Sequence, residues 1–395
     1  MSEIKVNSIK GVGASLAAIT VNNTDGSCTA NITNKPNRNL IINGAMQVAQ
    51  RGTSSTTSGY GSVDRFKVLY NGTDEAPTHA QVDLTSSDTP FTLGFRKAFK
   101  ITNGNQTSGA GASDFIAPQQ HIEGQNISSS GWNVTDPNSK LTISYWVRSS
   151  VAQTFFGRFR AFASSQYEYA YSFALSANTW TKVTTTIPGN SNFSSLVNTN
   201  AVGLFHIWQC FFGTDFTNNK TLNQLAAKVN ANKSPDMTST WYTTNDATFE
   251  ITGVQLEVGS VATDFEHRSF GQELALCQRY FQTVSRSSNA NSVNGTFAAG
   301  TCNNNAGNGG IIAAMVRFQT TMRAVPTMTQ SGTFSHHVSG VNVADCSLAF
   351  SQAYIDGVKC AGTQTTFVSA NGSCGELTSK YSDTSTATIS ASAEL

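Results

Sequence analysis

Residues 141–148 read LTISYWVR, and this stretch decides the fold class because every second side chain is apolar. In a β-strand, successive side chains point to opposite faces. One face of the predicted strand therefore carries Leu141, Ile143, Tyr145 and Val147. The opposite face carries Thr142, Ser144, Trp146 and Arg148. We expect Trp146 to lie on a face that a loop or a partner reaches.

Short apolar runs of the same kind recur from Asn39 to about Phe270, separated by turn residues about every ten positions. The predicted strands are Leu40–Asn43, Asp64–Leu69, Phe95–Thr102, Leu141–Arg148, Phe155–Phe162, Tyr167–Leu175, Trp180–Ile187, Val202–Trp208 and Phe249–Val258. This pattern favours a jelly-roll-sized sandwich of two antiparallel sheets. We assign residues 38–268 to this domain.

A second, smaller β domain is predicted over residues 285–395, after the chain passes through an Asn-, Gly- and Ser-rich stretch. Its expected strands are Ile311–Gln319, Ala324–Gln330, His336–Val343, Ser347–Tyr354 and Thr365–Ser369. The segment Thr386–Leu395 alternates apolar and polar residues, which indicates a last strand rather than a frayed end. The whole chain is therefore expected to be mainly β.

Two helices are predicted where apolar residues recur at helical spacing. The first covers Asn219–Asn232, and its apolar residues are Leu222, Leu225, Ala226 and Val229. The second covers Ser269–Thr283, and its apolar stripe is Phe270, Leu274, Cys277 and Phe281. Ser269 is the expected N-cap, with Glu273 in a shifted capping arrangement. We expect the second helix, residues 269–284, to link the two β domains.

Residues 1–37 cannot form a core of their own, because a few apolar side chains punctuate a polar stretch that ends at Pro36. The first of these apolar residues are Ile4, Val6 and Ile9. We expect an extended arm that becomes ordered against a partner. The three apolar side chains are its candidate attachment residues.

Composition limits the classes of partner. The chain has 395 residues, is 39% hydrophobic and contains 24 Phe, so it can bury real cores. Charged residues make up only 12%, the net charge is +1 and no Lys/Arg run exists, which argues against nucleic acid and membrane surfaces. The opening MSEIKVNSIKGVGAS has no signal-peptide-like apolar run, and no stretch approaches about 18 consecutive apolar residues. We expect the chain to be made and first kept in a cytoplasm.

Metal and disulfide signals are weak. Seven Cys occur without a C-x-x-C motif, so free thiols are expected, with a late disulfide among Cys302, Cys346, Cys360 and Cys374 as an alternative. His336 and His337 are adjacent, and adjacent strand residues point to opposite faces, so hydrogen bonding is favoured over a metal. The turn Asp136–Asn138 leaves a structural Ca²⁺ open but unassigned. No cofactor is predicted.

Four titratable residues, Glu257, Asp264, Glu266 and His267, lie close together in the sequence. A glycosidase needs two carboxylates about 5 to 10 Å apart across a sugar bond, and sequence spacing alone does not establish this. Glu257 alternates with Leu256 and Val258, which places it on the solvent face of a strand. The residues from 265 to 268 are expected to form a strand-to-helix junction held by hydrogen bonds and ion pairs. The sequence therefore favours a non-enzymatic protein.

Aromatic residues are the better candidates for binding. Sugar recognition uses flat apolar faces together with amide and hydroxyl groups, although a Trp in a sandwich more often packs in the core. Trp132, in SSSGWNVTD, and the pair Trp241 and Tyr242, in TSTWYTTND, have loop-like neighbours. We therefore predict that at most one or two aromatic residues contact a glycan, with Trp132, Trp241 and Tyr242 as the candidates.

Several stretches resemble those of a known family. Residues 251–282, ITGVQLEVGSVATDFEHRSFGQELALCQRYFQ, resemble a segment that recurs in tail-fibre and receptor-binding proteins of marine and cyanobacterial phages. Residues 38–55, NRNLIINGAMQVAQRGTSS, and GSVDRF at 61–66 resemble the opening of the same module. Residues 315–334, MVRFQTTMRAVPTMTQSGTF, resemble its C-terminal companion. The opening MSEIKVNSIKG is similar to the start of many cyanophage structural proteins.

The resemblance implies a jelly-roll, carbohydrate-binding-like central module in a fibre that is usually a homotrimer. It also implies that the arm, with Ile4, Val6 and Ile9, attaches to other virion or tail proteins, while the distal domains adhere to a host-surface glycan. The expected localisation is the virion. The alternatives are a capsid-vertex fibre, a tail adaptor without host contact, a polysaccharide depolymerase tailspike and a cellular carbohydrate-binding module. The depolymerase would show long repetitive β-helix coils, and the sequence has none.

Overall fold

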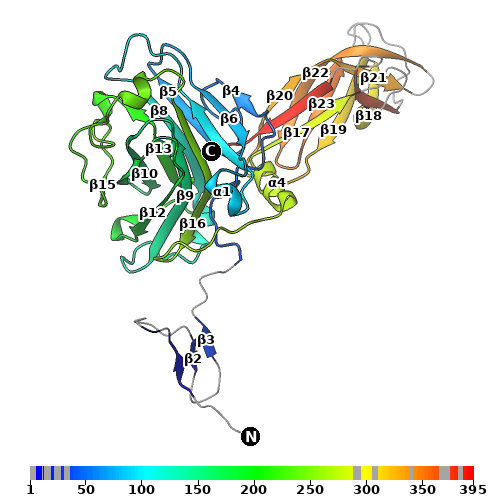
Figure 1. The fold of residues 1–395 in the computed structure, drawn as a ribbon. Helices are drawn as coiled ribbons and strands as arrows, with labels where there is room; N and C mark the ends of the chain where they lie inside the picture. The colour runs from blue at the N-terminus through cyan, green and yellow to red at the C-terminus, as the bar shows by residue number, and fades with distance from the viewer. Residues whose placement is uncertain are drawn as a thin grey trace.

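The computed structural model describes residues 6–10, 12, 19–21, 28–30, 36–287, 295–304, 310–338, 341–363, 374–380 and 386–395. These ranges form a mainly β structure with a small N-terminal sheet, a two-sheet sandwich and a C-terminal barrel (Figure 1). The strands within each sheet pair antiparallel. The predicted fold class is confirmed.

The sandwich consists of a six-stranded and a seven-stranded sheet. The six-stranded sheet has, in spatial order, β12 (Thr181–Pro188), β9 (Lys140–Ser149), β16 (Thr248–Val258), β7 (Lys97–Thr102), β6 (Thr78–Asp83) and β4 (Ser54–Ser55). The seven-stranded sheet has β14 (Phe211–Phe212), β8 (Phe115–Glu123), β13 (Val202–Gln209), β10 (Gln153–Phe162), β11 (Gln166–Leu175) and β15 (Leu225–Ala227), with β5 (Phe66–Asn71) paired to β8. The strands predicted between Asp64 and Val258 all overlap strands of these sheets.

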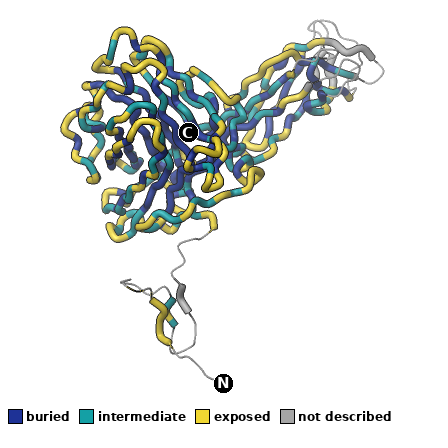
Figure 2. The backbone as a smooth tube through the Cα atoms, viewed as in Figure 1, coloured by how far each residue is buried: buried dark blue, intermediate teal, exposed yellow. Residues whose placement is uncertain are grey.

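The main core lies between the two sheets, where the backbone is buried throughout (Figure 2). Strand β9 supplies the predicted apolar face, and each of its side chains is fully buried: Leu141, Ile143, Tyr145 and Val147. The facing sheet contributes large aromatic side chains, including Phe155, Phe159, Tyr171 and Trp208. The predicted alternation of side chains between the two faces of β9 is therefore correct. Trp146 lies on the outer face of the six-stranded sheet.

The strand predicted at residues 40–43 is wrong. This segment turns instead of pairing, because Asn43 has a φ of 61°, in the left-handed region. The Asn43 side chain holds the turn by donating to the carbonyls of Val48 and Asp64, at 2.8 and 2.9 Å. An Asn side chain that bonds to nearby backbone offers the chain this alternative to a ladder.

The helix predicted over residues 219–232 is also wrong. Asn219 and Asn223 have φ values of 36° and 57°, which interrupt a right-handed helix. The stretch Leu225–Ala227 instead pairs with β11 as the edge strand β15. The apolar residues at helical spacing belong to a loop that covers the sheet, where Leu225 packs partly buried against the core. Tertiary packing, rather than the local spacing of apolar residues, determines the structure of this segment.

In the described part of the chain, four short α-helices and two 3₁₀ turns connect the strands: α1 (Thr89–Thr92), α2 (Gly124–Ser128), α3 (Thr240–Thr243), α4 (Phe270–Gln278), η1 (Ser191–Phe193) and η2 (Thr214–Phe216). Helix α4 begins after the predicted N-cap Ser269, but the capping box is completed by Gln272 rather than by Glu273. The helix ends earlier than predicted. Phe270 is 56% exposed, so its place on a buried stripe is wrong, whereas Cys277 is buried.

After α4 the chain forms a three-stranded sheet and a closed six-stranded barrel. The sheet has β17 (Phe281–Ser287), β25 (Thr386–Ser392) and β20 (Thr327–Ser331). The barrel has β18 (Thr296–Asn304), β19 (Gly310–Arg317), β23 (Gly357–Thr363), β22 (Val341–Tyr354), β21 (Phe334–Val338) and β24 (Cys374–Ser379).

The predictions for this C-terminal part have mixed outcomes. The last strand is confirmed as β25. The run His336–Val343 is not one strand, because β21 ends at Val338 and β22 begins at Val341. The strand predicted at Thr365–Ser369 lies outside the described residues.

The barrel and the sandwich meet through buried charges and aromatic rings. Glu394, just after β25, forms ion pairs with Arg65 and Arg51 of the sandwich. The Arg65 guanidinium lies 3.5 Å from the centre of the Tyr280 ring, and that of Arg51 lies 3.5 Å from the Phe281 ring. Residues from both ends of the barrel segment therefore contact the sandwich.

The N-terminal sheet is formed by β1 (Ser8–Ile9), β2 (Ile19–Val21) and β3 (Cys28–Ala30), in that order. Val6 and Ile9 are exposed, while Ile4 lies outside the described residues. The role of these three residues in attachment stays a prediction. Among the described residues, no helix has the length and apolar character needed to cross a membrane.

Candidate glycan-binding groove

The three aromatic candidates for glycan contact are buried, so their predicted exposure is wrong. Trp241 and Tyr242 have no exposed surface, and Trp132 is 5% exposed. The Trp241 indole N–H donates to the Thr248 carbonyl at 3.0 Å, and the Tyr242 ring stacks on Phe211.

Trp132 is held in the same way. Its indole N–H donates to the Ser139 carbonyl at 3.2 Å, and its ring packs edge-on against Phe193. Polar neighbours in the sequence indicated exposed loops. The rings of all three residues instead fill the ends of the sandwich core.

An aromatic groove lies on the outer face of the six-stranded sheet, where Trp146 was expected to be reachable. Its volume is about 320 Å³. Its lining includes Phe95, Ser144, Trp146, Lys182, Asp264 and His267. Trp146 is half-buried, so part of its surface remains open to a ligand.

The floor of the groove follows from strand register. Trp146 on β9 lies directly opposite Lys182 on β12 and Thr252 on β16. Directly opposed residues share one face of a sheet with their Cβ atoms about 5 Å apart. The exposed ammonium of Lys182 is therefore placed beside the indole of Trp146.

A β-bulge shapes one wall. The register of β16 against β9 shifts between Thr252 and Gln255, and Gly253 within this bulge has a φ of 63°. A Cβ on Gly253 would lie 2.7 Å from the Phe95 ring. Glycine is required at this position both for the backbone conformation and for the approach of Phe95.

The same wall is completed by an aromatic group after β16. The rings of Phe95, Phe265 and His267 contact one another, with centroids 4.9 to 5.1 Å apart. His267 Nε2 donates to the Leu93 carbonyl at 3.1 Å, which fixes the imidazole. These contacts hold residues 263–267 over the sheet.

Glu257 is buried, so its predicted position on a solvent face is wrong. Its two carboxylate oxygens accept hydrogen bonds from the Thr263 backbone N–H at 2.8 Å and the Thr263 hydroxyl at 2.7 Å. Gln255 donates to it at 2.9 Å, and Arg38 lies 3.5 Å away. A buried carboxylate persists when it is hydrogen-bonded and paired in this way. Glu257 therefore anchors the loop that carries Asp264.

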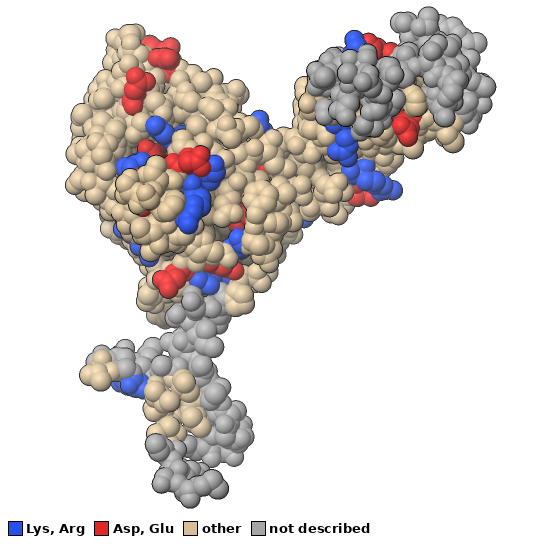
Figure 3. Space-filling model, turned by 45° about the vertical axis from the view of Figure 1, so that its right-hand side comes forward, with Lys and Arg blue, Asp and Glu red and all other residues tan. Residues whose placement is uncertain are grey.

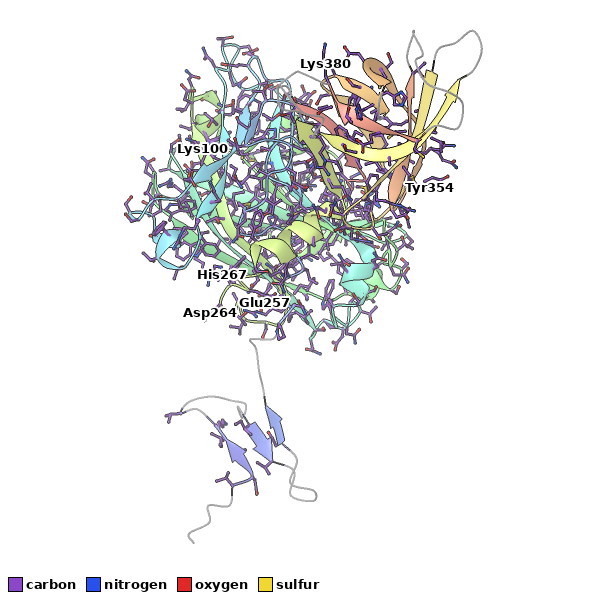
Figure 4. The ribbon with its side chains drawn as sticks, turned by 90° about the vertical axis from the view of Figure 1, so that its right-hand side faces the viewer. Lys100, Glu257, Asp264, His267, Tyr354 and Lys380 are labelled. Atoms are coloured by element: carbon purple, nitrogen blue, oxygen red, sulfur yellow. The ribbon has the colours of Figure 1, made fainter. Side chains whose placement is uncertain are left out.

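The predicted strand-to-helix junction is held by hydrogen bonds, as expected, but the partners are distant in the sequence. The Glu266 carboxylate accepts from the backbone N–H groups of Asn37 and Asn39, while Arg268 donates to the carbonyls of Asn39 and Ile41. The start of the sandwich segment is thereby tied to its end. Figure 4 shows Glu257, Asp264 and His267 close together on the sandwich, far from Tyr354 on the barrel.

The histidine pair and the turn at 136–138 make contacts within the protein. His336 is buried and His337 lies 4.0 Å from Glu376. Within the described ranges, no group of three His, Cys, Asp or Glu residues is arranged to hold a metal ion. In the turn at 136–138, Asp136 accepts a hydrogen bond from the Asn138 backbone N–H at 2.8 Å. Five cysteines are free thiols: Cys210, Cys277, Cys346, Cys360 and Cys374.

The groove combines the groups that a sugar ring needs. Trp146 supplies accessible apolar surface, the buried Phe95 supports the wall, and Asp264 and Lys182 supply an exposed acceptor and an exposed donor. Binding sites of this size commonly combine an apolar lining with a few polar groups that set orientation. The sequence pattern located Trp146, but Phe95 and Lys182 come from distant segments that only the fold brings together.

Comparisons with known proteins give distant structural similarity only. No family model matches the chain, and no curated protein matches it. The enzymatically active domain of tailspike protein 4 of bacteriophage CBA120 is 10% identical over 57% of this chain, with a TM-score of 0.32. The matched part spans only 22% of that chain.

Carbohydrate-binding modules are also similar at this level. The family 11 module of the cellulase Lic26A-Cel5E from Clostridium thermocellum is 10% identical, covers 55% of this chain and 98% of its own, and has a TM-score of 0.25. The N-terminal cellulose-binding domain of Cellulomonas fimi β-1,4-glucanase C is 13% identical, with coverages of 55% and 99% and a TM-score of 0.25. At these scores, no residue role is transferred from them.

Proposed function

We propose that this chain is an adhesive structural protein of a phage tail fibre, and that its sandwich binds a glycan in the groove beside Trp146. The observation that carries the proposal is the half-buried Trp146 indole, flanked by Lys182 and facing Asp264 and His267 in one groove. The sequence resemblance to tail-fibre proteins of marine and cyanobacterial phages supports the biological setting.

The mechanism is adhesion by multiplied weak binding. One sugar ring stacked on Trp146, with hydroxyls bonded to Asp264 and Lys182, would bind weakly because the groove is small and open to solvent. Several copies on one particle raise the effective affinity by about 10²- to 10⁴-fold when they engage together. Most of the face visible in Figure 3 is uncharged. A sparsely charged surface of this kind suits adhesion to a glycan.

The oligomer is proposed to be a homotrimer that attaches to the virion through the N-terminal arm. Exposed Val6 and Ile9 and the short three-stranded sheet β1–β3 support this, because such a sheet has little apolar surface to bury alone. Open sheet edges are also suited to pairing with another chain. Light scattering on the full chain should give three times the 42.0 kDa chain mass, and a monomer would contradict the trimer.

The proposed activity is binding rather than hydrolysis. Of the carboxylates near the groove, Glu257 already accepts hydrogen bonds on both oxygens from Thr263. Glu266 is likewise engaged by the backbone of Asn37 and Asn39. Asp264 is then the one exposed carboxylate among these three. A glycosidase needs a pair of carboxylates across the sugar bond.

The test is glycan-array binding of the labelled full chain, followed by titration of the best neutral glycan. Trp146→Ala should weaken binding at least about tenfold through loss of the stacking surface. Trp146→Phe should retain part of the affinity, and Phe270→Ala, at an exposed aromatic residue outside the groove, should change nothing. Equal binding by the wild type and a folded Trp146→Ala variant would overturn the groove assignment.

A further inference from the structure

The outer face of the seven-stranded sheet carries an unusual group of charges. Arg158 and Arg160 project from this face of β10, and Glu168 projects from the neighbouring β11 directly opposite Arg160. Residues 213–238 cover this part of the sheet and add Lys220 and Lys233. Glu168 has no exposed surface, and Arg158 is 2% exposed.

The Glu168 carboxylate interacts with three cations. Arg158 and Arg160 both form ion pairs with Glu168 Oε1, and Lys220 Nζ lies 3.7 Å from Glu168 Oε2. Lys233 is half-buried on the Phe216 ring at 4.1 Å. Its pKa is lowered to about 8 by burial and by repulsion from Arg158 and Arg160. The cluster therefore holds more positive than negative charge in a poorly solvated place.

Two other buried ion networks in the described chain hold no excess of positive charge. At the barrel junction, Arg51 and Arg65 face Asp64 and Glu394. On the six-stranded sheet, Arg148 bridges Asp88 and Glu250. Buried charges that lack a counter-charge destabilise a fold. The excess around Glu168 thus points to a missing anion.

Polar atoms without partners surround the same place. Both amide atoms of Gln209, the Nε of Arg158, the hydroxyl of Ser234 and the Oε2 of Glu168 are buried and have no hydrogen-bond partner within the described chain. Gln209 lies opposite Phe156 on β10, two residues from Arg158 along the same face. Buried polar groups are nearly always hydrogen-bonded, so these atoms also indicate an absent ligand.

We propose that this cluster is a second site, which binds an anionic sugar through its carboxylate. Arg160, Lys220 and Lys233 would hold the carboxylate, because Arg and Lys form strong charge-assisted hydrogen bonds with carboxylates. Gln209 and Ser234 would bond to ring hydroxyls. Arg160 is 14% exposed and Lys233 is half-buried, so the ligand enters beside these two side chains. This site lies on the sheet opposite the groove and does not depend on binding there.

The test is calorimetric titration of the full chain with galacturonate at constant ionic strength, with galactose as the neutral counterpart. Galacturonate should bind at least about tenfold more tightly than galactose, because only galacturonate carries the carboxylate. Lys233→Gln and Lys220→Gln should each weaken galacturonate binding about tenfold. Lys100→Gln, on β7 of the other sheet, is the matched control and should leave it unchanged.

A Glu168→Gln variant separates an anion site from a purely structural network. Removing the carboxylate should lower Tm in the absence of ligand, and it should enlarge the rise in Tm that galacturonate causes. Equal binding of galactose and galacturonate would overturn the proposal, as would wild-type galacturonate affinity in both lysine variants. Stabilisation by sodium sulfate without any by galacturonate would overturn the assignment to a sugar.

Discussion

The sandwich and the C-terminal barrel are both built from antiparallel strands, but they fill their cores with different side chains. The sandwich core contains large aromatic residues, including Phe66, Phe99, Tyr145, Trp208 and Trp241. The shared core of the barrel and its adjoining sheet contains two buried Phe residues, Phe297 and Phe334, and otherwise consists of smaller residues: Val284, Ala314, Val316, Leu348, Val358, Cys360, Leu377, Ala387 and Ile389.

This difference predicts which of the two parts is the more stable. Aromatic side chains bury about 150–250 Å² each, so the sandwich should gain more per residue from burial than the barrel. The groove on the outer face of the sandwich therefore rests on an interior filled by large buried aromatic side chains. We therefore expect calorimetry to resolve two unfolding transitions, with the barrel melting first.

The largest expected effect is in the sandwich core. Trp241→Ala should lower the free energy of unfolding of the sandwich by about 3–5 kcal/mol, through lost apolar contact and a cavity. Denaturant unfolding followed by fluorescence measures this change. Phe270→Ala is the control, because Phe270 is exposed. An unchanged midpoint for Trp241→Ala would contradict the burial of this indole.

In the barrel, Leu377→Ala should cost about 2–5 kcal/mol, because Leu377 on β24 has no exposed surface. Only the barrel transition should shift in calorimetry. If the sandwich transition moved by the same amount, the two parts would unfold as one unit and the comparison would fail.

The junction between the two parts should show an unusual pH dependence. Burial raises the pKa of Asp64 to about 6, above its ordinary value of 3.8. The folded state therefore holds this proton more tightly than the unfolded state, so the group destabilises the fold at pH 7. The destabilisation is relieved as pH falls from about 6 towards 4.

Asp64→Asn should remove this dependence. Between about pH 4 and 6, the slope of the unfolding free energy against pH should become less negative. Integrated over this pH range, the change in unfolding free energy is at most about 3 kcal/mol. Urea titrations at several pH values measure this slope. Identical slopes in the wild type and the variant would show that the pKa of Asp64 is not raised in the folded state.

The smallest effect is expected at the helix between the two parts. Ser269 caps α4 and accepts a hydrogen bond from the Gln272 N–H at 3.4 Å. Ser269→Ala should cost about 1 kcal/mol. Ser269→Asp, which can still cap, should restore most of it in the same denaturant experiment. A full loss in both variants would argue against the capping role.

The strand pattern could be predicted from the sequence because burial on one face enforces a period of two. This worked for β9 and for strands between Asp64 and Val258, and the N-cap Ser269 was found from its side chain. It failed at Asn43, Asn219 and Asn223, where single residues in left-handed conformations redirect the chain. The turn at Asn43, for example, depends on side-chain hydrogen bonds to the carbonyls of Val48 and Asp64, which local periodicity does not report.

The candidate sites were harder to predict than the strands. Trp132, Trp241 and Tyr242 have polar neighbours in sequence but apolar neighbours in space. The groove wall forms only because the bulge at Gly253 lets Phe95 approach residues 265–267, far along the chain. The cluster at Glu168 required knowing that residues 213–238 cover β10 and β11. Each case depends on tertiary packing, which no local pattern contains.

The return of the chain at the barrel junction has a mechanical consequence. β25 pairs along the whole of β17, the Ala393 N–H donates to the Tyr280 carbonyl at 2.7 Å, and Glu394 is clamped by Arg65. The barrel is thus tethered by two adjacent segments rather than by one linker. A force applied to the barrel would therefore load these two paired strands together instead of stretching a single linker.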